Sequence, residues 1–426
     1  MADAIEKGRR LMKNVQKQAL LVLTGIILIR GFATGAINMT ASLFLTPVSQ
    51  SLGVGIGTLS LYFSIMSVVT VLWLPYAGKL IDRHPIRRLA LVSAALQALT
   101  YACFGLLHHV FGWYLLSIPQ AMGATILVSL LGPILIHRWF PHNTGLVLGI
   151  QMAFVWLFTA VLQPVTSRII EAGGWRRAYF FDGLVTFFVV TAATLLLLRD
   201  RPDTEPNAKP EKSAQAQQGD GVEIPEKVAT RSASFFLLLI FMIAMTGTAV
   251  FTQHIPTYGG LLGYSLRQVG LVMSLVSLGS AMGSVAIGFI SDRIGGLKTC
   301  YGIIFLWVLA VIGFLCSGTG FAVFAASAFL YGVTSSSIVV IAPILTLIFY
   351  GKKDYEKIYA KVSMSAPIAS ILLIPTYGFI YDATNSYFAV LILLLVLLGI
   401  AGVGIMLGWK NRCTAEGCPV WRRNQP

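Results

Sequence analysis

Charged side chains are scarce in this chain of 426 residues: Asp, Glu, Lys and Arg together make up 11% of it. A soluble globular protein carries about 25%, because charge keeps its surface in water. Hydrophobic residues account for 56% of the sequence. The composition therefore excludes an ordinary soluble domain and indicates a membrane protein.

Acidic residues are fewer than basic ones, 17 against 31, so the net charge is +14. Basic chains often bind nucleic acid, but here most Lys and Arg stand in alternate polar loops and in the two terminal segments. The positive-inside rule places those loops and both termini in the cytoplasm. Membrane topology thus explains the charge, with attraction to anionic membrane lipid as a further consequence, and no nucleic-acid partner is expected.

Several functional motifs are also missing from the sequence. There is no Walker loop and no group of His, Cys and carboxylates at metal-ligand spacing. No Ser or Cys stands in the pattern of a catalytic triad. The chain has five cysteines, and Cys413 and Cys418 lack the spacing and partners of a zinc site, so we expect reduced thiols. We expect a protein that is not an enzyme and uses no metal or cofactor, and an ATP-driven pump is disfavoured.

Apolar stretches long enough to cross a bilayer recur about twelve times. Gly and Pro occur within them, and membrane helices tolerate both because neighbouring helices satisfy the freed backbone groups. The sequence therefore predicts an all-α membrane protein of twelve transmembrane helices, near residues 19–47, 57–79, 89–107, 112–136, 145–168, 177–198, 234–256, 266–290, 298–317, 321–349, 359–381 and 387–409.

One long polar stretch, residues 199–233, is rich in Pro, Gln, Ala, Lys and Glu and has the composition of a disordered linker. It divides the chain into parts of similar hydrophobic content. We therefore expect an N-terminal six-helix bundle over 1–198, a cytoplasmic linker over 199–233, a C-terminal six-helix bundle over 234–409 and a cytoplasmic tail over 410–426.

A short motif appears twice, as Gly-Lys-Leu-Ile-Asp-Arg at 78–83 and as Gly-Phe-Ile-Ser-Asp-Arg at 288–293. Each copy follows a long apolar run, which predicts two related halves of a transporter. We expect the glycines to permit close helix approach. The acids would cap or pair with a helix end, and the basic residues would hold the loop at the membrane interface. The predicted gating residues are Gly78, Asp82, Arg83, Arg88, Gly288, Asp292 and Arg293.

This motif resembles the loop motif of the major facilitator superfamily, although Pro85 stands where that family usually has Gly. Three further segments resemble the oxalate/formate antiporter and monocarboxylate transporter families: Arg-Trp-Phe-Pro with later glycines at 138–149, His-Ile-Pro-x-Tyr at 254–258, and Gly-x2-Tyr-Asp-x2-Asn-Ser-Tyr at 378–387. The segments occur in the same order as in those families, and the resemblance covers nearly the whole chain. It implies the major facilitator fold and a carrier of an anion or monocarboxylate.

The sequence departs from those families at their anion-binding positions. The Arg expected in the eighth helix corresponds to Ser284, and the Asp one turn earlier corresponds to Ser280. The Lys of the eleventh helix corresponds to Ala366. A dianion clamp of the oxalate kind is therefore not expected, and a bulkier or more apolar anion is.

Arg30 is a single cation within the first apolar run. The apolar residues 19–29 precede it and, as a helix, advance the chain by about 16 Å, which places Arg30 near mid-bilayer. An Arg there costs about 2.5–3.5 kcal/mol on insertion scales, so it should face a cavity rather than lipid. Thr34 and Asn38 follow on the same helix face. Arg30 could grip a carboxylate; alternatively, it bonds to a neighbouring helix or snorkels to the interface.

Other polar residues fall within the apolar runs. Asp182 is expected to pair with Arg176 or Arg177, with proton coupling as a second interpretation, and Gln163 with Pro164 to mark a kink. Gln120 and Gln151 would face the cavity or bridge helices, and His254 would meet the substrate or a proton or have no role in transport. With Arg30, Thr34 and Asn38, the candidate substrate-binding residues are Gln120, Gln151, His254, Ser280 and Ser284.

The first functional hypothesis is a secondary active or facilitative transporter of a small organic anion, a monocarboxylate, working by alternating access as an antiporter or symporter. Its partners would be the substrate, a proton or counter-anion, and lipid, and it would act as a monomer in a bacterial cytoplasmic membrane. The second hypothesis is a transporter, often an exporter, of a neutral or hydrophobic small molecule, with Arg30 structural. A transporter-like receptor is the third.

Overall fold

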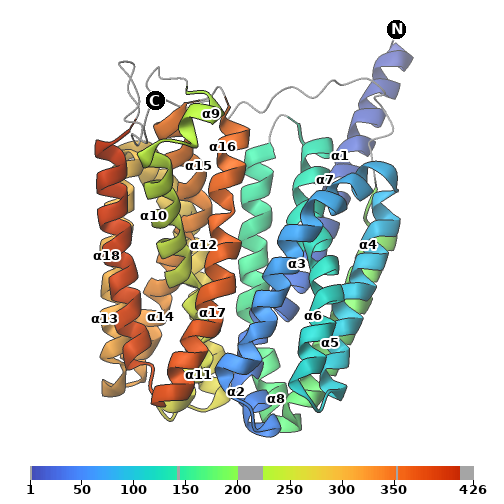
Figure 1. The fold of residues 1–426 in the computed structure, drawn as a ribbon. Coiled ribbons are helices and arrows are strands. Elements are labelled where there is room, and N and C mark those ends of the chain that lie inside the picture. Colours follow the sequence, from blue (N-terminus) through green and yellow to red (C-terminus); the bar gives the residue numbers. More distant parts are fainter. Residues whose placement is uncertain (1, 142–143, 200–223, 352–353, 413–426) are drawn as a thin grey trace, which may run out of the picture. The chain divides into compact units, whose positions relative to one another are not determined.

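The computed structural model describes residues 2–141, 144–199, 224–351 and 354–412. The side chains of residues 2–16, Asp82 and Glu356 are not described either. Most of the predicted linker, residues 200–223, and the predicted tail from residue 413, with its two cysteines, lie outside the described residues. All regular secondary structure in the described part is helical (Figure 1). The prediction of an all-α chain is therefore confirmed for these residues.

The chain divides into two compact units. Unit 1 comprises Met1–Leu52 and Val68–Ala214, and unit 2 comprises Gly53–Ser67 and Gln215–Pro426. Helix α3, Ile56–Arg83, is shared, because its first part belongs to unit 2 and its second part to unit 1. The predicted N-terminal bundle includes all residues before the linker, whereas Gly53–Ser67 of that stretch belong to unit 2.

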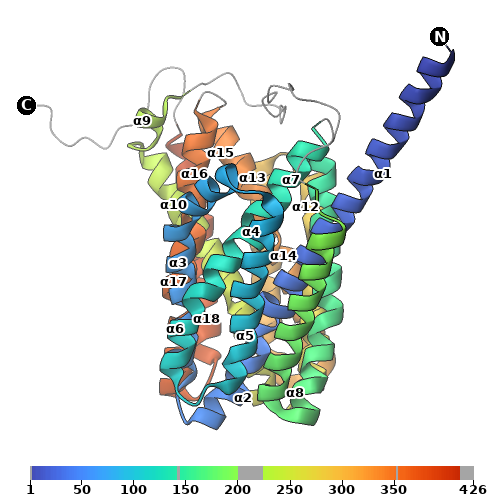
Figure 2. The same ribbon diagram turned by 90° about the vertical axis from the view of Figure 1, so that its right-hand side faces the viewer.

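Unit 1 contains the last part of α3 and a series of helices that differ in their winding. In chain order they are α1 (Ala2–Phe32), η1 (Ala33–Met39), α2 (Ala41–Leu52), α4 (Ile86–Ala94), η2 (Ala95–Leu99), α5 (Thr100–Cys103), η3 (Phe104–Leu106), α6 (Val110–Ala124), η4 (Thr125–Leu130), α7 (Leu131–Trp139) and α8 (Thr144–Leu196). Elements η1, η2 and η4 are π-helices. Helix α1 extends beyond the other helices of its unit (Figure 2).

Helix α8 consists of two helices, because Gly174 interrupts it with a positive φ of 80° and a ψ of 162°. Its 53 residues would measure about 80 Å as one straight helix, far more than the hydrocarbon core of a bilayer, about 30 Å. The predicted spans 145–168 and 177–198 lie on either side of Gly174. The sequence prediction therefore separated two helices that are joined here with almost no loop.

Unit 2 begins with the first part of α3 and continues after the linker. Its other elements are α9 (Glu226–Ala229), α10 (Ala233–Val250), η5 (Phe251–Gln253), α11 (Ile255–Leu261), α12 (Leu266–Ile294), α13 (Gly296–Leu315), η6 (Ser317–Thr319), α14 (Phe321–Ser335), α15 (Ser337–Tyr350), α16 (Tyr355–Ser363), α17 (Ser365–Thr384) and α18 (Phe388–Lys410). Helix α10 packs against α17 and α18, and α14 packs against α12 and α13.

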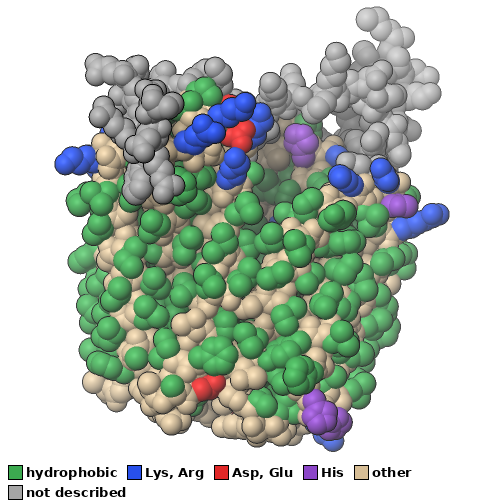
Figure 3. All heavy atoms as spheres, in the orientation of Figure 1, with side chains coloured by type: hydrophobic (Ala, Val, Ile, Leu, Met, Phe, Trp, Pro, Cys, Tyr) green, Lys and Arg blue, Asp and Glu red, His purple; other side chains and the backbone are tan. Residues whose placement is uncertain are grey.

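Eleven continuous helical segments of the described chain are long and apolar enough to cross a membrane, and one of them is Thr144–Leu196. Each of the ten other predicted spans overlaps one of the ten other segments. Large apolar side chains are exposed on these helices, for example Leu196 at 78% and Phe111 at 76%. The face seen in Figure 3 is mostly hydrophobic in its middle, and most of its visible Lys and Arg side chains lie near one end. This surface suits a lipid environment.

The core of unit 1 forms along one stripe of α1. Val22, Ile26, Ile29 and Ala33 recur at helical spacing, and none of them has exposed surface. They belong to one apolar cluster with side chains of α4, η4, α7 and α8, including Leu131. This packing fixes the rotation of α1 and therefore the direction in which Arg30 points.

Candidate functional site

Helix α1 changes its winding just after Arg30. Residues Ala33–Met39 form the π-helix η1, in which backbone bonds join residues five apart instead of four. Small residues allow α8 to pack closely there: a Cβ at Gly31 would lie 2.8 Å from the ring of Phe158, and one at Gly35 would lie 3.2 Å from the hydroxyl of Thr159. Short π-helical stretches are frequent at functional sites.

Arg30 is buried within unit 1, with 6% of its surface exposed. Its Nη1 donates a hydrogen bond of 2.7 Å to Oε1 of Gln151, on α8. Gly132 makes room for the side chain, because a Cβ there would lie 2.9 Å from Cδ of Arg30. The Nε of Arg30 has no partner, and no carboxylate of the described residues pairs with the guanidinium. Arg30 is thus a buried cation whose charge is not balanced by a neighbouring acid.

Thr34 and Asn38 follow Arg30 along η1. The hydroxyl of Thr34 is buried and has no hydrogen-bond partner. Asn38 is half-buried, and its Oδ1 accepts a hydrogen bond from Nε2 of Gln97 at 3.3 Å. In the predicted polar row, Arg30 and Thr34 therefore carry buried groups without a partner, and Asn38 is bonded through its oxygen.

Gln97 is a residue that the sequence analysis did not single out. It lies in the π-helix η2 and is fully buried. Besides Asn38, its Nε2 bonds to the carbonyl oxygen of Ala33 at 2.9 Å, whereas its Oε1 has no partner. The signal that could have found it is the one that pointed to Gln120: an uncharged polar residue inside an apolar span.

Two more glutamines of unit 1 carry unsatisfied groups. Gln120, on α6, has 1% of its surface exposed and an unpartnered Oε1, and Gln151 has an unpartnered Nε2. A buried polar group without a partner costs about 1–3 kcal/mol. Such groups are usually satisfied by water or a ligand. Unit 1 therefore offers both donors and acceptors to a polar molecule.

The candidate substrate-binding residues of unit 2 already have hydrogen-bond partners within the protein. His254 is fully buried, its Nδ1 lies 2.9 Å from the hydroxyl of Tyr387, and its Nε2 lies 2.8 Å from the carbonyl oxygen of Ile374. Ser280 donates to the carbonyl oxygens of Val276 and Gly332. These bonds tie helices of unit 2 together and leave no polar atom of His254 for a ligand.

Ser284 is half-buried, and its hydroxyl donates to the carbonyl oxygen of Ala281 at 2.9 Å. This is the local bonding that serine commonly makes within a helix. The resembling families have an Arg at this position, whereas here the side chain is hydrogen-bonded within its own helix.

The expected pairing of Asp182 with Arg176 or Arg177 is wrong. The Oδ2 of Asp182 accepts a hydrogen bond of 2.9 Å from the hydroxyl of Thr166. Arg176 instead donates to the carbonyl oxygens of Gly105 and Leu107, both at 3.0 Å. Its guanidinium also lies over the ring of the adjacent Trp175, 4.3 Å from the ring centroid. Arg176 therefore closes the loop after η3.

Gln163 makes a contact that the sequence did not predict, whereas the kink at Gln163 and Pro164 stays a prediction. The Nε2 of Gln163 lies 3.4 Å from the carbonyl oxygen of Met39, to which it donates a hydrogen bond. Gln163 is therefore a link from α8 to the last residue of η1.

The repeated motif shows no close helix approach at its glycines, contrary to expectation. A Cβ at Gly78 or Gly288 would meet nothing within 4 Å. Arg293 is exposed, and its guanidinium lies over the ring of Phe289, 4.2 Å from the centroid. Asp292 and Arg83 are exposed, and the side chain of Asp82 lies outside the described residues.

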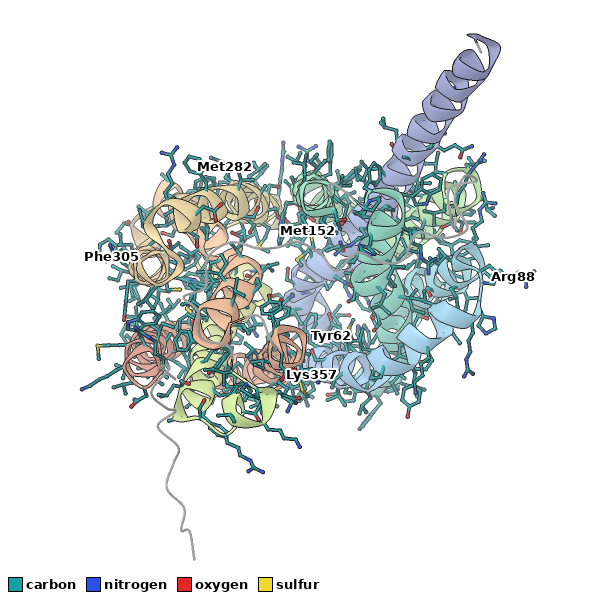
Figure 4. All side chains as sticks on the ribbon, turned by 90° about the horizontal axis from the view of Figure 1, so that it is seen from above. Tyr62, Arg88, Met152, Met282, Phe305 and Lys357 are labelled. Carbon is teal, nitrogen blue, oxygen red and sulfur yellow. The ribbon has the colours of Figure 1, made fainter. Side chains whose placement is uncertain are left out.

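Arg88, the remaining predicted gating residue, is exposed and points away from the helices of unit 1 (Figure 4). Phe305 likewise points outward from unit 2. The gating role of the motif stays a prediction.

Known proteins resemble this chain over most of its length. An uncharacterized MFS-type transporter of Escherichia coli, YhjX, is 23% identical over 370 residues, which is 84% of this chain and 87% of that protein. The oxalate:formate antiporter of Oxalobacter formigenes is 22% identical over 61% of this chain and 60% of its own. Monocarboxylate transporter 12 of Mus musculus is also 22% identical, over 61% of this chain and 58% of its own. The chain thus spans about three fifths of these last two relatives.

Among solved structures, the nucleoside transporter NupG superposes with a TM-score of 0.69, at 13% identity over 92% of this chain and 98% of NupG. At this identity the likeness shows the fold alone. The sequence profile of the Major Facilitator Superfamily matches residues 26–320 and 262–417. These matches confirm the resemblance that the loop motifs suggested, and with the membrane-spanning helices they show a transport protein of the membrane rather than an enzyme. The chain belongs to the Major Facilitator Superfamily.

Proposed function

We propose that this transporter moves a small organic anion, a monocarboxylate, across a bacterial cytoplasmic membrane by alternating access. Twelve spans in two six-helix halves would carry out the cycle, with both termini in the cytoplasm. The observation that carries the proposal is Arg30, a buried guanidinium without a described acidic partner. A charge in this position is costly unless it is matched during function.

The surroundings of Arg30 suit a carboxylate. Its bond to Gln151 uses one nitrogen of the guanidinium and holds the group in place. The Nε of Arg30 and the Nε2 of Gln151 are unpartnered donors, and carboxylate oxygens are acceptors. Thr34, Asn38 and Gln120 would contact the remainder of the substrate. His254, Ser280 and Ser284 stay outside this proposed set, because bonds within their own unit already satisfy them.

The uncharged residues at the positions matched to those families support a substrate with a single negative charge. Ser280, Ser284 and Ala366 replace the charged residues of the resembling families. One guanidinium balances one carboxylate, so a monocarboxylate fits better than a dicarboxylate such as oxalate. Either a proton or a counter-anion would complete the cycle, and a monomer would suffice.

The bond between Arg30 and Gln151 also favours a second candidate function. If it serves only to fasten α1 to α8, Arg30 is structural and the substrate is a neutral or hydrophobic compound. The two candidates differ in what competes for transport: carboxylates in the first, uncharged molecules in the second.

Uptake into proteoliposomes distinguishes them. Labelled lactate and benzoate would be offered with competing lactamide and benzamide, which match them in shape but lack the charge. We expect the acids to enter and the amides not to compete. Arg30→Gln should weaken the binding of the acids by about 10- to 150-fold, since a hydrogen bond to a charged group contributes about 1.5–3 kcal/mol. Competition by the amides equal to that of the acids would contradict the proposal.

The matched control is Arg168→Gln, which removes a guanidinium from an exposed position of α8. It should leave the half-saturation constant for lactate and benzoate unchanged. Protein abundance in the membrane would be measured for both variants, so that loss of transport is not confused with loss of protein.

A further inference from the structure

Glutamine side chains from neighbouring helices hold both ends of the π-helix η1. At its first residue, the carbonyl oxygen of Ala33 accepts from Nε2 of Gln97 at 2.9 Å. At its last residue, the carbonyl oxygen of Met39 accepts from Nε2 of Gln163 at 3.4 Å. All these residues lie in unit 1. The two ends of one irregular segment are thus bonded from two different helices.

These contacts matter because π-helical bonding is rare and persists only where its surroundings support it. Where backbone bonding changes from four residues to five, one N–H group is left without its regular carbonyl, and where it changes back, one carbonyl group is left without its regular N–H. A buried carbonyl without a partner is costly, so a side-chain N–H at that point favours the π form over the α form. At the end of η1, the carbonyl oxygen of Met39 accepts such bonds from Nε2 of Gln163 and from the hydroxyl of Ser42, the latter at 3.3 Å. At its start, the bond from Gln97 fixes the carbonyl group of Ala33, where the π winding begins.

The winding of η1 decides which side chains share a line with Arg30. In an α-helix, a residue four positions on lies about 40° further round, and one eight positions on about 80°. The wider π turn contains more residues, so each residue of η1 advances by less than the angle of about 100° in an α-helix, and this shortfall offsets the lead of about 80° that Asn38 would otherwise have over Arg30. Thr34 and Asn38 are therefore aligned with Arg30 in η1. In α winding, Ile37, seven residues on, would replace Asn38 on that line.

Gln97 also fixes the direction of the Asn38 amide. The carbonyl oxygen of Ala33 can only accept, so the group of Gln97 beside it must be the amide nitrogen. That nitrogen in turn requires the oxygen of Asn38 at the contact of 3.3 Å. The Nδ2 of Asn38 is then turned away from Gln97, and it adds a donor to the row that begins at Arg30.

We propose that Gln97 and Gln163 are positioning residues that hold η1 in its π winding and thereby place the Asn38 amide nitrogen on the same line as Arg30. The role for an anionic substrate rests on the proposed function. The winding itself does not, and it can be measured without a substrate.

The test is a cysteine scan of residues 33–39 in full-length protein whose five native cysteines are replaced by serine. Each single-cysteine protein, in membranes, reacts with a small, positively charged methanethiosulfonate reagent. With both glutamines present, we expect residue 38, which is half-buried, to react faster than residue 37, which has no exposed surface. In Gln97→Met/Gln163→Met, which keeps the side-chain length but removes the donors, the maximum should move from 38 to 37.

A faster reaction at 37 than at 38 with both glutamines present would overturn the proposal, and so would a maximum that stays at 38 in the double variant. Loss of stability alone exposes the buried positions and raises their reactivities together, so it does not move the maximum by one residue. If the double variant fails to reach the membrane, the scan with both glutamines present still decides the winding, and Gln97→Met alone tests its cause. Gln253→Met, the same change in unit 2, should leave the pattern as it is.

The outcomes separate this inference from the proposed function. A shift from 38 to 37 together with no preference for acids over amides would support the positioning role and refute the anion. A preference for acids together with a maximum that stays at 38 would support the anion and refute the positioning role.

Discussion

Helix α3 begins without a capping side chain of its own, and Asp382 supplies the cap from α17. The carboxylate oxygens of Asp382 accept from the backbone N–H groups of Ile56 and Gly57, each at 2.8 Å. The residue before the helix is Gly55, which has no side chain to offer. The contacts lie within unit 2. The first turn of α3 therefore depends on a residue more than three hundred positions away in sequence.

Helix α12, which corresponds to α3 in the second half of the sequence, is capped differently. Helix α12 begins at Leu266, and Ser265 and Gln268 form a complete capping box there. Gly55 and Ser265 have the same separation in sequence as the two copies of the repeated loop motif, which begin at Gly78 and Gly288. One half thus caps this helix locally, and the other receives its cap from α17.

Asp382→Ala should therefore destabilise the protein. Removal of an N-cap side chain costs about 0.5–2 kcal/mol, and two bonds to one carboxylate place this change at the upper end, about 2 kcal/mol. A loss of that size lowers the melting temperature by about 4–8 °C for a unit of about 200 residues. Thermal unfolding in detergent, followed by tryptophan fluorescence, measures the change. Asp382→Asn keeps an oxygen acceptor and should lose less.

A double variant sharpens the test. A Cβ at Gly55 would collide with the carboxylate of Asp382, so Gly55→Ser alone should destabilise. With Asp382→Ala the space opens, and the new serine can cap α3 as Ser265 caps α12. The double variant should then be more stable than either single variant. Additive losses, or an unchanged melting temperature in Asp382→Ala, would refute the reasoning.

Two smaller effects are expected in unit 2. The hydroxyl of Ser64 donates at 2.7 Å to the carbonyl oxygen of Ile371, which lacks its helical partner because Pro375 has no N–H. Ser64→Ala should cost about 1–3 kcal/mol in thermal unfolding, and the cost should shrink in a Pro375→Ala background; an equal cost in both would contradict this origin. Glu226 pairs with Lys361 at 2.8 Å, but both side chains are partly exposed. Glu226→Gln should change stability by less than about 1 kcal/mol, less still in high salt, and a larger loss would show that the pair matters more than its exposure suggests.

Much of the architecture followed from the sequence. The apolar runs predicted helices that the described chain contains, because a bilayer leaves a spanning segment few alternatives. The break at Gly174 shows the limit of this reasoning: a single glycine with positive φ replaced the loop that was expected between two spans.

The candidate site followed from the sequence only in part. Arg30 stood out because a lone cation in an apolar run is expensive, and the structure shows it buried. Gln97 did not stand out, because an uncharged amide costs less than a cation to place within the membrane. Its role also depends on Ala33 and Asn38, which are far away along the chain. The partner of Asp182 was assigned by nearness in sequence, whereas folding brought Thr166 to it.

The order of residues was enough to specify the class of this protein: a helical membrane transporter of the Major Facilitator Superfamily with one cation deep in its first span. Hydrophobicity and charge belong to single residues and a motif to a short stretch of sequence. All three can therefore be recognised before the chain folds. The folded chain was needed to show how η1 is wound, which amides hold it, and that Asp382 caps α3. Those features are hydrogen bonds between distant segments, and they exist only after packing has brought a particular donor to a particular acceptor.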